Sequence, residues 1–386
     1  MGDYDQELSK IVAQLNRAAP SQQRPAARLA AGTAGSASLD ELLAAASARN
    51  ASDVLLIAGA PLVLRVNGAL SIGSGPALDP EDVRGLVLPL LEPSQSEELQ
   101  RKRTVDFSFV RESLGRFRVN IHYQRGTLAA SIRLLPSRIP SLESLHLPAT
   151  LARLAERRQG LVLVTGPTGC GKTSTLAALI DIVNTKRAAH VVTIEDPVEY
   201  QHANRSSIVE QIEVGRDTPD FAVTLRSIMR QTPDVILVGE MRDAETMATA
   251  LTAAETGHLV LSTLHTNDAI QAVSRILDSF PTGNQPQIRQ QLSLALAAVI
   301  AQQLVPGTDN GQRWPATEIM TATDAVRSLI RKGDDHQLRS QISVGRSEGM
   351  MTMEQSLAEL VRSGRITRET ALAHCFRTDD FVRYAG

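Results

Sequence analysis

A glycine-rich segment in the middle of the chain has the residue types and spacing of a phosphate-binding loop. Residues 166–173 read GPTGCGKT, which fits the pattern G-x-x-x-x-G-K-[ST]. Glycines let the backbone wrap closely around a polyphosphate and point its N–H groups inward. We expect Lys172 to place a positive charge at the outer phosphates and the Thr173 hydroxyl to bind Mg²⁺. The predicted nucleotide-binding residues are Gly166, Pro167, Thr168, Gly169, Cys170, Gly171, Lys172, Thr173 and Ser174.

The residues on either side of this loop supply the structural context that the motif needs. The continuous apolar run Leu161–Thr165 predicts a buried strand that leads into the loop. The segment Lys172–Asn184 predicts a helix, whose N-terminus would direct the positive end of its dipole at the same anion. A strand, a glycine-rich loop and a helix in this order indicate a P-loop that binds ATP together with Mg²⁺.

Three further apolar runs are predicted strands of a parallel sheet, and each is followed by a polar side chain. These pairs are Val191–Ile194 with Glu195, Val235–Val238 with Glu240, and Leu259–Leu264 with His265. Ligands bind beyond the carboxyl ends of the strands in an open parallel sheet, so these side chains are predicted to face the nucleotide.

Nucleotide hydrolysis needs one carboxylate to activate water and another to hold the metal ion. We expect Glu195 to orient the attacking water and accept its proton. Glu240 is expected to hold Mg²⁺ through a water molecule, and His265 to sense the γ-phosphate. The sequence leaves open whether the two glutamates exchange these roles, because it contains no distances.

The composition excludes several classes of protein. Lys and Arg number 40 against 42 Asp and Glu, so the chain lacks the basic excess of a dedicated nucleic-acid binder, and no nucleic-acid partner is expected. Two cysteines, Cys170 and Cys375, cannot build a disulfide scaffold or a cysteine-rich zinc site. The apolar runs are far shorter than the roughly 20 residues of a membrane helix, which predicts a cytoplasmic protein.

The length of 386 residues predicts two folded domains. The predicted segments are a flexible N-terminal extension (1–37), an α+β domain (38–140), an α/β ATPase core (141–280) and a helical C-terminal portion (281–386). Two pairs of residues have the spacing of a capping box, in which the side chains at the first and fourth positions bond each other's backbone. These are Ser38 with Glu41, and Thr352 with Gln355.

Taken together, these motifs resemble those of the type II/IV secretion ATPases, and in particular of their type IV pilus retraction (twitching-motility, PilT-type) branch. The similar segments are GPTGCGKTST (166–175, Walker A), VTIEDPVEY (192–200, aspartate box), DVILVGEMRDAET (234–246, Walker B) and TGHLVLSTLHT (256–266, histidine box). AVRSLIRK (325–332) and EGMMTMEQSL (348–357) are similar to segments of the retraction branch.

The resemblance implies a PAS-like α+β N-terminal domain followed by a RecA-like P-loop ATPase domain with a helical C-terminal portion. It also implies a homohexamer at the cytoplasmic face of the inner membrane, which hydrolyses ATP, drives a pilus platform protein and removes pilin from the fibre. A paralogous retraction ATPase is a further implied partner. In this family, arginines of the N-terminal domain contribute to the nucleotide site, and the matching residues here are Arg116, Arg118 and Arg133.

Three alternative functions are consistent with a RecA-like ring. A pilus assembly or type II secretion ATPase often carries a tetra-cysteine zinc module, which two cysteines cannot form. A nucleic-acid translocase is disfavoured by the balanced charge. A non-hydrolysing accessory ring member is disfavoured by the complete set of phosphate-loop residues. Retraction is therefore the preferred prediction.

Overall fold

A computed structural model describes residues 38–66, 68–136, 138–309 and 311–386 of the chain. The chain divides into two compact units, Met1–Leu135 and Pro136–Gly386. This division falls close to the boundary predicted after residue 140. The extension predicted over residues 1–37 lies outside the described residues.

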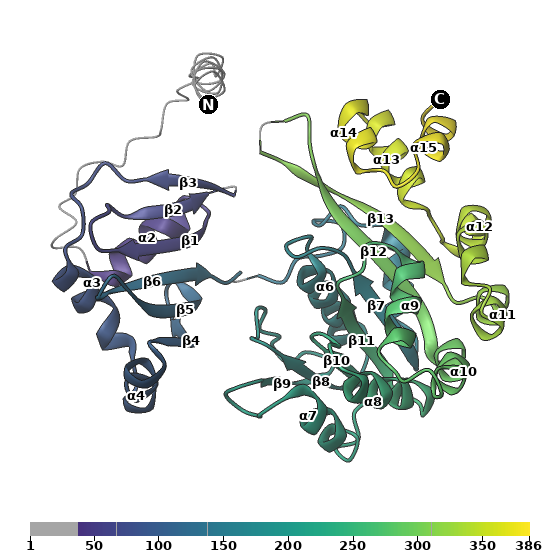
Figure 1. The fold of residues 1–386 in the computed structure, drawn as a ribbon, viewed down its shortest axis with the longest axis horizontal. Helices are drawn as coiled ribbons and strands as arrows, with labels where there is room; N and C mark the ends of the chain where they lie inside the picture. The colour runs from purple at the N-terminus through teal and green to yellow at the C-terminus, as the bar shows by residue number, and fades with distance from the viewer. Residues whose placement is uncertain (1–37, 67, 137, 310) are drawn as a thin grey trace, which may run out of the picture. The chain divides into compact units, whose positions relative to one another are not determined.

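The first unit is an antiparallel sheet with helices packed on one face (Figure 1). Its strands are β1 (Ala51–Ile57), β2 (Val63–Val66), β3 (Ala69–Ile72), β4 (Thr104–Arg111), β5 (Gly115–Gln124) and β6 (Thr127–Leu134), and its helices are α2 (Leu39–Ala48), α3 (Pro80–Val87) and α4 (Pro93–Lys102). The strand order is β3-β2-β1-β6-β5-β4. Leu43, Val83 and Leu99 of the helices share one apolar cluster with strand residues such as Val54 and Ile121. The α+β class predicted for this part of the chain is confirmed.

Both predicted capping boxes are present. The Ser38 hydroxyl accepts a hydrogen bond from the Glu41 amide at 3.3 Å, and the Glu41 carboxylate accepts one from the Ser38 amide at 2.8 Å. Thr352 and Gln355 exchange the same pair of bonds at the start of α13 (Met353–Arg362). Each box satisfies two N–H groups that a helix start would otherwise leave without partners.

The second unit is built on a seven-stranded sheet. Its strands are β7 (Gly160–Thr165), β8 (His190–Glu195), β9 (Ile208–Glu213), β10 (Val235–Val238), β11 (Leu259–Leu264), β12 (Leu296–Pro306) and β13 (Arg313–Thr321). The order is β13-β12-β7-β11-β10-β8-β9, with every neighbouring pair parallel except β12 and β13. The predicted RecA-like α/β fold is confirmed, and the four strands predicted from apolar runs are β7, β8, β10 and β11.

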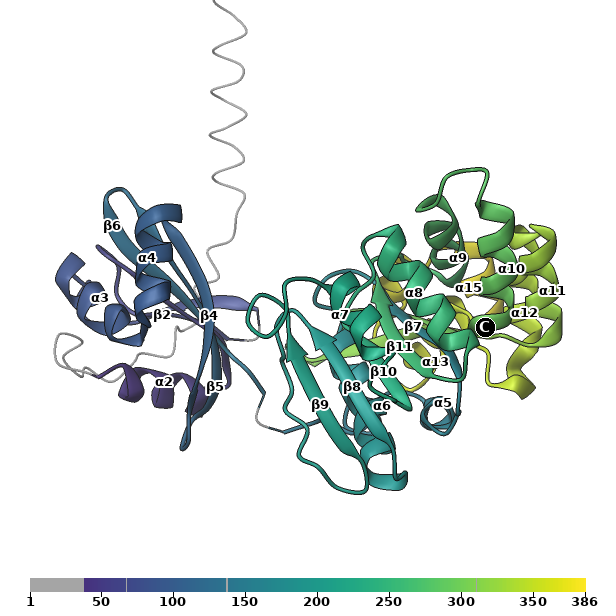
Figure 2. The ribbon, with the colours of Figure 1, turned by 90° about the horizontal axis from the view of Figure 1, so that it is seen from below.

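Helices cover both faces of this sheet, which explains why its central strands are apolar at successive positions. The helices are α5 (Ala152–Ala155), α6 (Lys172–Lys186), α7 (Phe221–Ile228), α8 (Ala244–Glu255), α9 (Ala269–Asp278), α10 (Gln285–Ala295), α11 (Asp324–Lys332), α12 (Leu338–Val344), α13, α14 (Arg368–His374) and α15 (Thr378–Ala385). Leu163 of β7 belongs to the apolar cluster under α7–α12, whereas Val164 belongs to the cluster under α5 and α6. Figure 2 shows α8–α10 and α5–α6 on opposite sides of the strands.

The prediction that residues 281–386 are helical is wrong for β12 and β13. Alanine at positions 295, 297, 298 and 301 favours a helix by intrinsic propensity. The same stretch is buried along its length, however, and pairs with β7 on one side and β13 on the other. Pairing and burial in the sheet outweigh a preference worth only tenths of a kcal/mol per residue.

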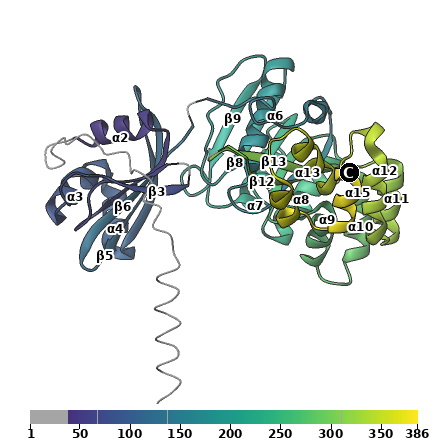
Figure 3. The ribbon, with the colours of Figure 1, turned by 90° about the horizontal axis from the view of Figure 1, so that it is seen from above.

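The last three helices pack on the far end of the β12–β13 pair. Met353, Leu357 and Phe381 share an apolar cluster with Val305 and Ala316 of these strands. Helices α13 and α15 lie beside each other in Figure 3. Among the residues that the structure describes, none of the helices combines the length and apolar character required to cross a bilayer.

Candidate active site

The predicted phosphate loop lies between β7 and α6 (Figure 1). Gly166 has a φ of +140°, and a Cβ atom there would lie 2.1 Å from the Gln302 carbonyl oxygen. Gly171 has a φ of +91° immediately before the first helical residue. Glycine is therefore required at Gly166 by close backbone approach and at Gly171 by the left-handed conformation.

Lys172 is held inside this loop. Its Nζ donates hydrogen bonds to the carbonyl oxygens of Gly166 at 2.8 Å and Pro167 at 3.1 Å, and the residue is only 9% exposed. Burial lowers the pKa of Lys172, an effect opposed by the nearby Cys170 and Glu240. A bound polyphosphate would stabilise the charged ammonium in this buried place, so the loop fits an anionic ligand.

Gln302 of β12 braces the phosphate loop and was not predicted from the sequence. Its side-chain amide donates to the Cys170 carbonyl, and its Oε1 accepts from the Thr175 hydroxyl at 2.9 Å. The same hydroxyl oxygen lies 3.1 Å from the Gly171 carbonyl oxygen. Gln302 is buried. The only local signal is two glutamines at the end of a strongly apolar run, and that run lies in the segment predicted to be helical.

We predict that Gln302→Leu lowers kcat/KM for ATP about tenfold or more. The change leaves the buried Cys170 carbonyl without its donor, which typically costs about 1–3 kcal/mol. Steady-state phosphate release over a range of ATP concentrations measures the effect. Gln303→Leu is the matched control, because Gln303 donates to the His374 carbonyl rather than to the loop. Equal kcat/KM values for the two variants would contradict this role of Gln302.

Glu195 is the last residue of β8 and is buried. Its Oε1 accepts hydrogen bonds from the Thr193 hydroxyl at 2.7 Å and from the Gln211 amide at 3.0 Å. Gln211 also donates to the Tyr200 carbonyl at 2.8 Å, while the Tyr200 hydroxyl lies 2.8 Å from Ser174 Oγ. These bonds connect the carboxylate to the segment after β8 and to the first turn of α6.

Glu240 lies one residue beyond the glycine that follows β10. Its Oε2 is 3.4 Å from His265 Nε2, and its Oε1 pairs with Arg242. His265 follows β11 and is 54% exposed in its side chain. Two of the side chains predicted at strand ends, Glu240 and His265, are therefore in contact.

The strand order explains how these groups gather. Strand β11 lies between β7 and β10, and β8 is the neighbour of β10. The registers Thr165 with Leu264, Ser262 with Val238, and Val238 with Ile194 align the carboxyl ends of these parallel strands. The phosphate loop, His265, Glu240 and Glu195 therefore lie along one edge of the sheet, as predicted for ligand binding beyond strand ends.

The three predicted arginines lie in the first unit. Arg133 pairs with Asp53 at 2.9 Å, and Arg116 donates to the Ser108 hydroxyl at 2.9 Å. Arg118 lies between β4 and β6, opposite Arg133 in the β5–β6 register. The phosphate loop belongs to the second unit, and the part of these arginines in a nucleotide site stays a prediction.

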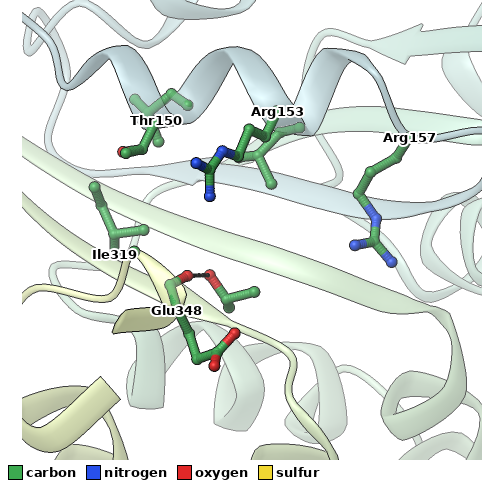
Figure 4. A pocket seen from close by; sticks show the side chains of 9 residues that line it. Thr150, Arg153, Arg157, Ile319 and Glu348 are labelled. Atoms are coloured by element: carbon green, nitrogen blue, oxygen red, sulfur yellow. Dashed lines mark hydrogen bonds between the residues drawn. The ribbon is translucent and has the colours of Figure 1, made fainter. Parts of the chain in front are cut away.

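A separate groove of about 150 Å³ lies elsewhere in the second unit (Figure 4). Arg153 and Arg157 line one side of it, and Ile319 and Glu348 line the other. Thr321 is also part of the lining. The Thr321 hydroxyl donates to the Glu348 carbonyl at 3.3 Å. The groove is lined by no predicted site residue, so the candidate active site is the edge that carries the phosphate loop.

The residues at that edge fit a nucleotide with a magnesium ion. The backbone N–H groups at the start of α6 are available to phosphate oxygens, since a first helical turn has no intrahelical acceptors for them. Thr173 and Glu240 supply a hydroxyl and a carboxylate oxygen, and oxygen ligands are those that Mg²⁺ prefers. The site can therefore position a nucleoside triphosphate beside two glutamates.

Comparison with known proteins agrees with this geometry. The family model described as type II/IV secretion system protein matches residues 128–374. The type IV pilus ATPase PilU of Pseudomonas aeruginosa is 40% identical over 341 residues, which are 88% of this chain and 89% of PilU. The type IV pilus retraction ATPase PilT of the same organism is 43% identical over 333 residues, which are 86% of this chain and 96% of PilT.

A solved structure shows the same fold with a nucleotide bound. The crystal structure of the pilus retraction motor PilT with bound ADP superposes with a TM-score of 0.84 at 43% identity, covering 90% of this chain and 99% of that chain. Its ligand agrees with nucleotide binding by the fold described above. The chain therefore belongs to the type II/IV secretion ATPase family, as an ATP-hydrolysing enzyme of the pilus retraction (PilT) type.

Proposed function

We propose that this ATPase is a motor that retracts type IV pili by removing pilin subunits from the fibre. The observation that carries the proposal is the 43% identity to a pilus retraction ATPase over 96% of that protein. The proposed working form is a homohexamer docked on a platform protein at the cytoplasmic face of the inner membrane. A paralogous retraction ATPase is a further proposed partner, since the chain is nearly as similar to PilU as to PilT.

The phosphate loop is proposed to bind the ATP phosphates through its backbone amides and Lys172. The Lys172 ammonium now bonds two loop carbonyls, and a phosphate oxygen would replace these acceptors. Gln302 fixes the Cys170 carbonyl and so supports the curvature of the loop from β12. Such preorganisation lowers the cost of ordering the site when the nucleotide binds.

Glu195 is proposed to be the general base. It is buried at the end of β8, and Thr193 and Gln211 fix its orientation through Oε1. A fixed carboxylate can align a water molecule with the γ-phosphate and accept its proton as the phosphorus–oxygen bond forms.

Glu240 and Thr173 are proposed to hold Mg²⁺, Glu240 through a water molecule. Glu240 follows β10, which is separated from β7 only by β11, so this carboxylate lies on the same edge of the sheet as the phosphate loop. When bound, the ion would neutralise charge on the β- and γ-phosphates.

His265, in contact with Glu240, is proposed to report loss of the γ-phosphate to α9, which begins four residues later. Arg116, Arg118 and Arg133 of the N-terminal unit are proposed to contribute to a nucleotide site.

Surface pili in cells whose only copy carries Lys172→Ala test the direction of the motor. We expect many pili and no twitching, because assembly would continue without removal of subunits. Few or no pili would assign the protein to pilus assembly instead. Hydrolysis by the purified wild-type chain that rises several-fold with DNA would favour a nucleic-acid translocase.

A further inference from the structure

A cluster of charged side chains is buried between the phosphate edge of the second unit and its C-terminal helices. It consists of Glu318 on β13, Arg339 on α12 and Glu354 on α13, with Asp268 beside it at the start of α9. Glu318 and Glu354 are each 1% exposed, and the Arg339 side chain is 14% exposed. Burying charges costs several kcal/mol per ion unless they are well paired, so the arrangement requires an explanation.

The pairing within this buried charge cluster is incomplete. Arg339 Nη1 lies 3.6 Å from Glu354 Oε2, which is an ion pair but too long for a hydrogen bond. Within the described part of the chain, Arg339 Nη1 and Glu318 Oε2 have no hydrogen-bond partner. Burial raises the pKa of Glu318 to about 7, an effect opposed by the Ala269 amide and Arg339 and reinforced by Asp268 and Glu354. The guanidinium therefore forms its ion pair with Glu354, and Glu318 is a second buried carboxyl group beside it.

The two carboxyl groups are hydrogen-bonded to different helix starts. Glu318 Oε1 accepts a hydrogen bond from the Ala269 amide, the first residue of α9, at 2.9 Å. Glu354 Oε1 accepts one from the Arg377 amide, immediately before α15, at 3.2 Å. The first contact lies on the segment that follows His265, and the second lies among the C-terminal helices.

Strands β12 and β13 connect this cluster to the phosphate loop. Gln302 on β12, which braces the loop, pairs in register with Thr317 on β13, the residue before Glu318. The Thr317 amide donates to the Ser356 hydroxyl of α13 at 3.0 Å. Strand β13 contacts α9, α12 and α13 (Figure 1). Strand β13 therefore links α9 and the phosphate loop to the groups around Arg339.

We propose that Arg339 is a two-position switch, which pairs with Glu354 in one nucleotide state and with Glu318 in another, and so passes the movement of α9 to α12–α15. The exchange breaks the Arg339–Glu354 ion pair and forms an Arg339–Glu318 pair. The inference rests on the proposed nucleotide cycle at the phosphate loop.

Two isosteric variants should have opposite effects on nucleotide preference. Glu318→Gln removes the charge that attracts Arg339 to β13, so Arg339 should stay paired with Glu354. In Glu354→Gln, Arg339 should instead stay paired with Glu318. The ratio of the Kd values for a non-hydrolysable ATP analogue and for ADP should shift in opposite directions, each by at least about fivefold, the lower end of usual allosteric couplings. Glu359→Gln is the matched control on α13, because Glu359 pairs with Arg346 at the surface, and it should leave the ratio unchanged.

Trp314 provides a second readout. It is the only tryptophan of the sequence and lies on β13, with its ring 4.3 Å from the His146 ring and 4.2 Å from the Arg365 guanidinium. In the wild-type full chain its emission should change when ADP replaces the analogue. In Glu318→Gln and Glu354→Gln the difference in emission between the two nucleotide complexes should be at least about fivefold smaller than in the wild type. The emission of Glu318→Gln should differ from that of Glu354→Gln with either nucleotide.

The double variant Glu318→Gln/Arg339→Met tests whether the effect of Glu318→Gln depends on Arg339, even if Glu354→Gln does not fold. Without the arginine, Glu318→Gln should no longer alter the Kd ratio relative to Arg339→Met alone. Shifts in the same direction for the two glutamine variants, or an undiminished effect of Glu318→Gln in the Arg339→Met background, would overturn the switch. A wild-type chain that binds neither nucleotide would instead contradict the proposed function of the phosphate loop.

Discussion

Replacing Lys172 by alanine should lower the rate of ATP hydrolysis about a hundredfold to a thousandfold, the usual cost of losing one preorganised donor to the charge that develops in a transition state. The Lys172 ammonium lies between the carbonyls of Gly166 and Pro167, where the phosphates are proposed to bind. Alanine leaves those phosphates without their protein cation. Steady-state phosphate release by the purified full chain measures the loss.

This variant should fold normally. Burial lowers the pKa of Lys172, which means that the charged side chain is held at a cost in the ligand-free protein. Its removal should therefore leave the thermal unfolding midpoint unchanged or raise it. Lys186→Ala is a matched control on the same helix, because Lys186 forms an exposed pair with Glu156 and should keep wild-type hydrolysis. More than a tenth of the wild-type rate in Lys172→Ala would contradict the assignment.

The second large effect is expected at Glu195, where binding and turnover should separate. Glu195→Gln should bind ATP with a Kd within about threefold of wild type but hydrolyse it about 10²–10⁴ times more slowly, the usual contribution of a general base. Glutamine preserves an acceptor for Thr193 and Gln211, so the geometry of the β8 end should persist. A fluorescent ATP analogue measures binding, and single-turnover phosphate release measures chemistry.

A parallel variant assigns the roles of the two glutamates. Glu240→Gln should raise the Mg²⁺ concentration needed for half-maximal activity, because it removes the proposed metal-side carboxylate. Glu210→Gln serves as the control, because Glu210 on β9 is exposed and pairs with His190 on β8. Loss of ATP binding in Glu195→Gln, with a normal Mg²⁺ requirement in Glu240→Gln, would show that the roles are reversed.

The parts of the site that the sequence predicted are local. The phosphate loop is one contiguous motif, and Glu195, Glu240 and His265 each follow an apolar run that is recognisable as a buried strand. The capping boxes are also local, because four consecutive residues contain both bonds of each box. Such features need no knowledge of which strands become neighbours.

Features that depend on tertiary pairing could not be predicted in this way. Gln302 is separated from Cys170 by 132 positions and reaches it only because β12 pairs with β7. The alanine-rich stretch around Leu296 has a helical propensity, and only its place in the sheet makes it a strand. The buried pairing of Glu318, Arg339 and Glu354 likewise arises from three elements that meet only in the folded unit.

Retraction events of fluorescently labelled pili on living cells test the central claim most directly. Cells that carry the wild-type chain as their only copy should show pili that extend and then shorten. Cells with Lys172→Ala should extend pili that almost never shorten, while Lys186→Ala cells behave as wild type. Pili that shorten at the wild-type frequency in the Lys172→Ala cells, or that never extend in them, would contradict a retraction motor driven by this phosphate loop.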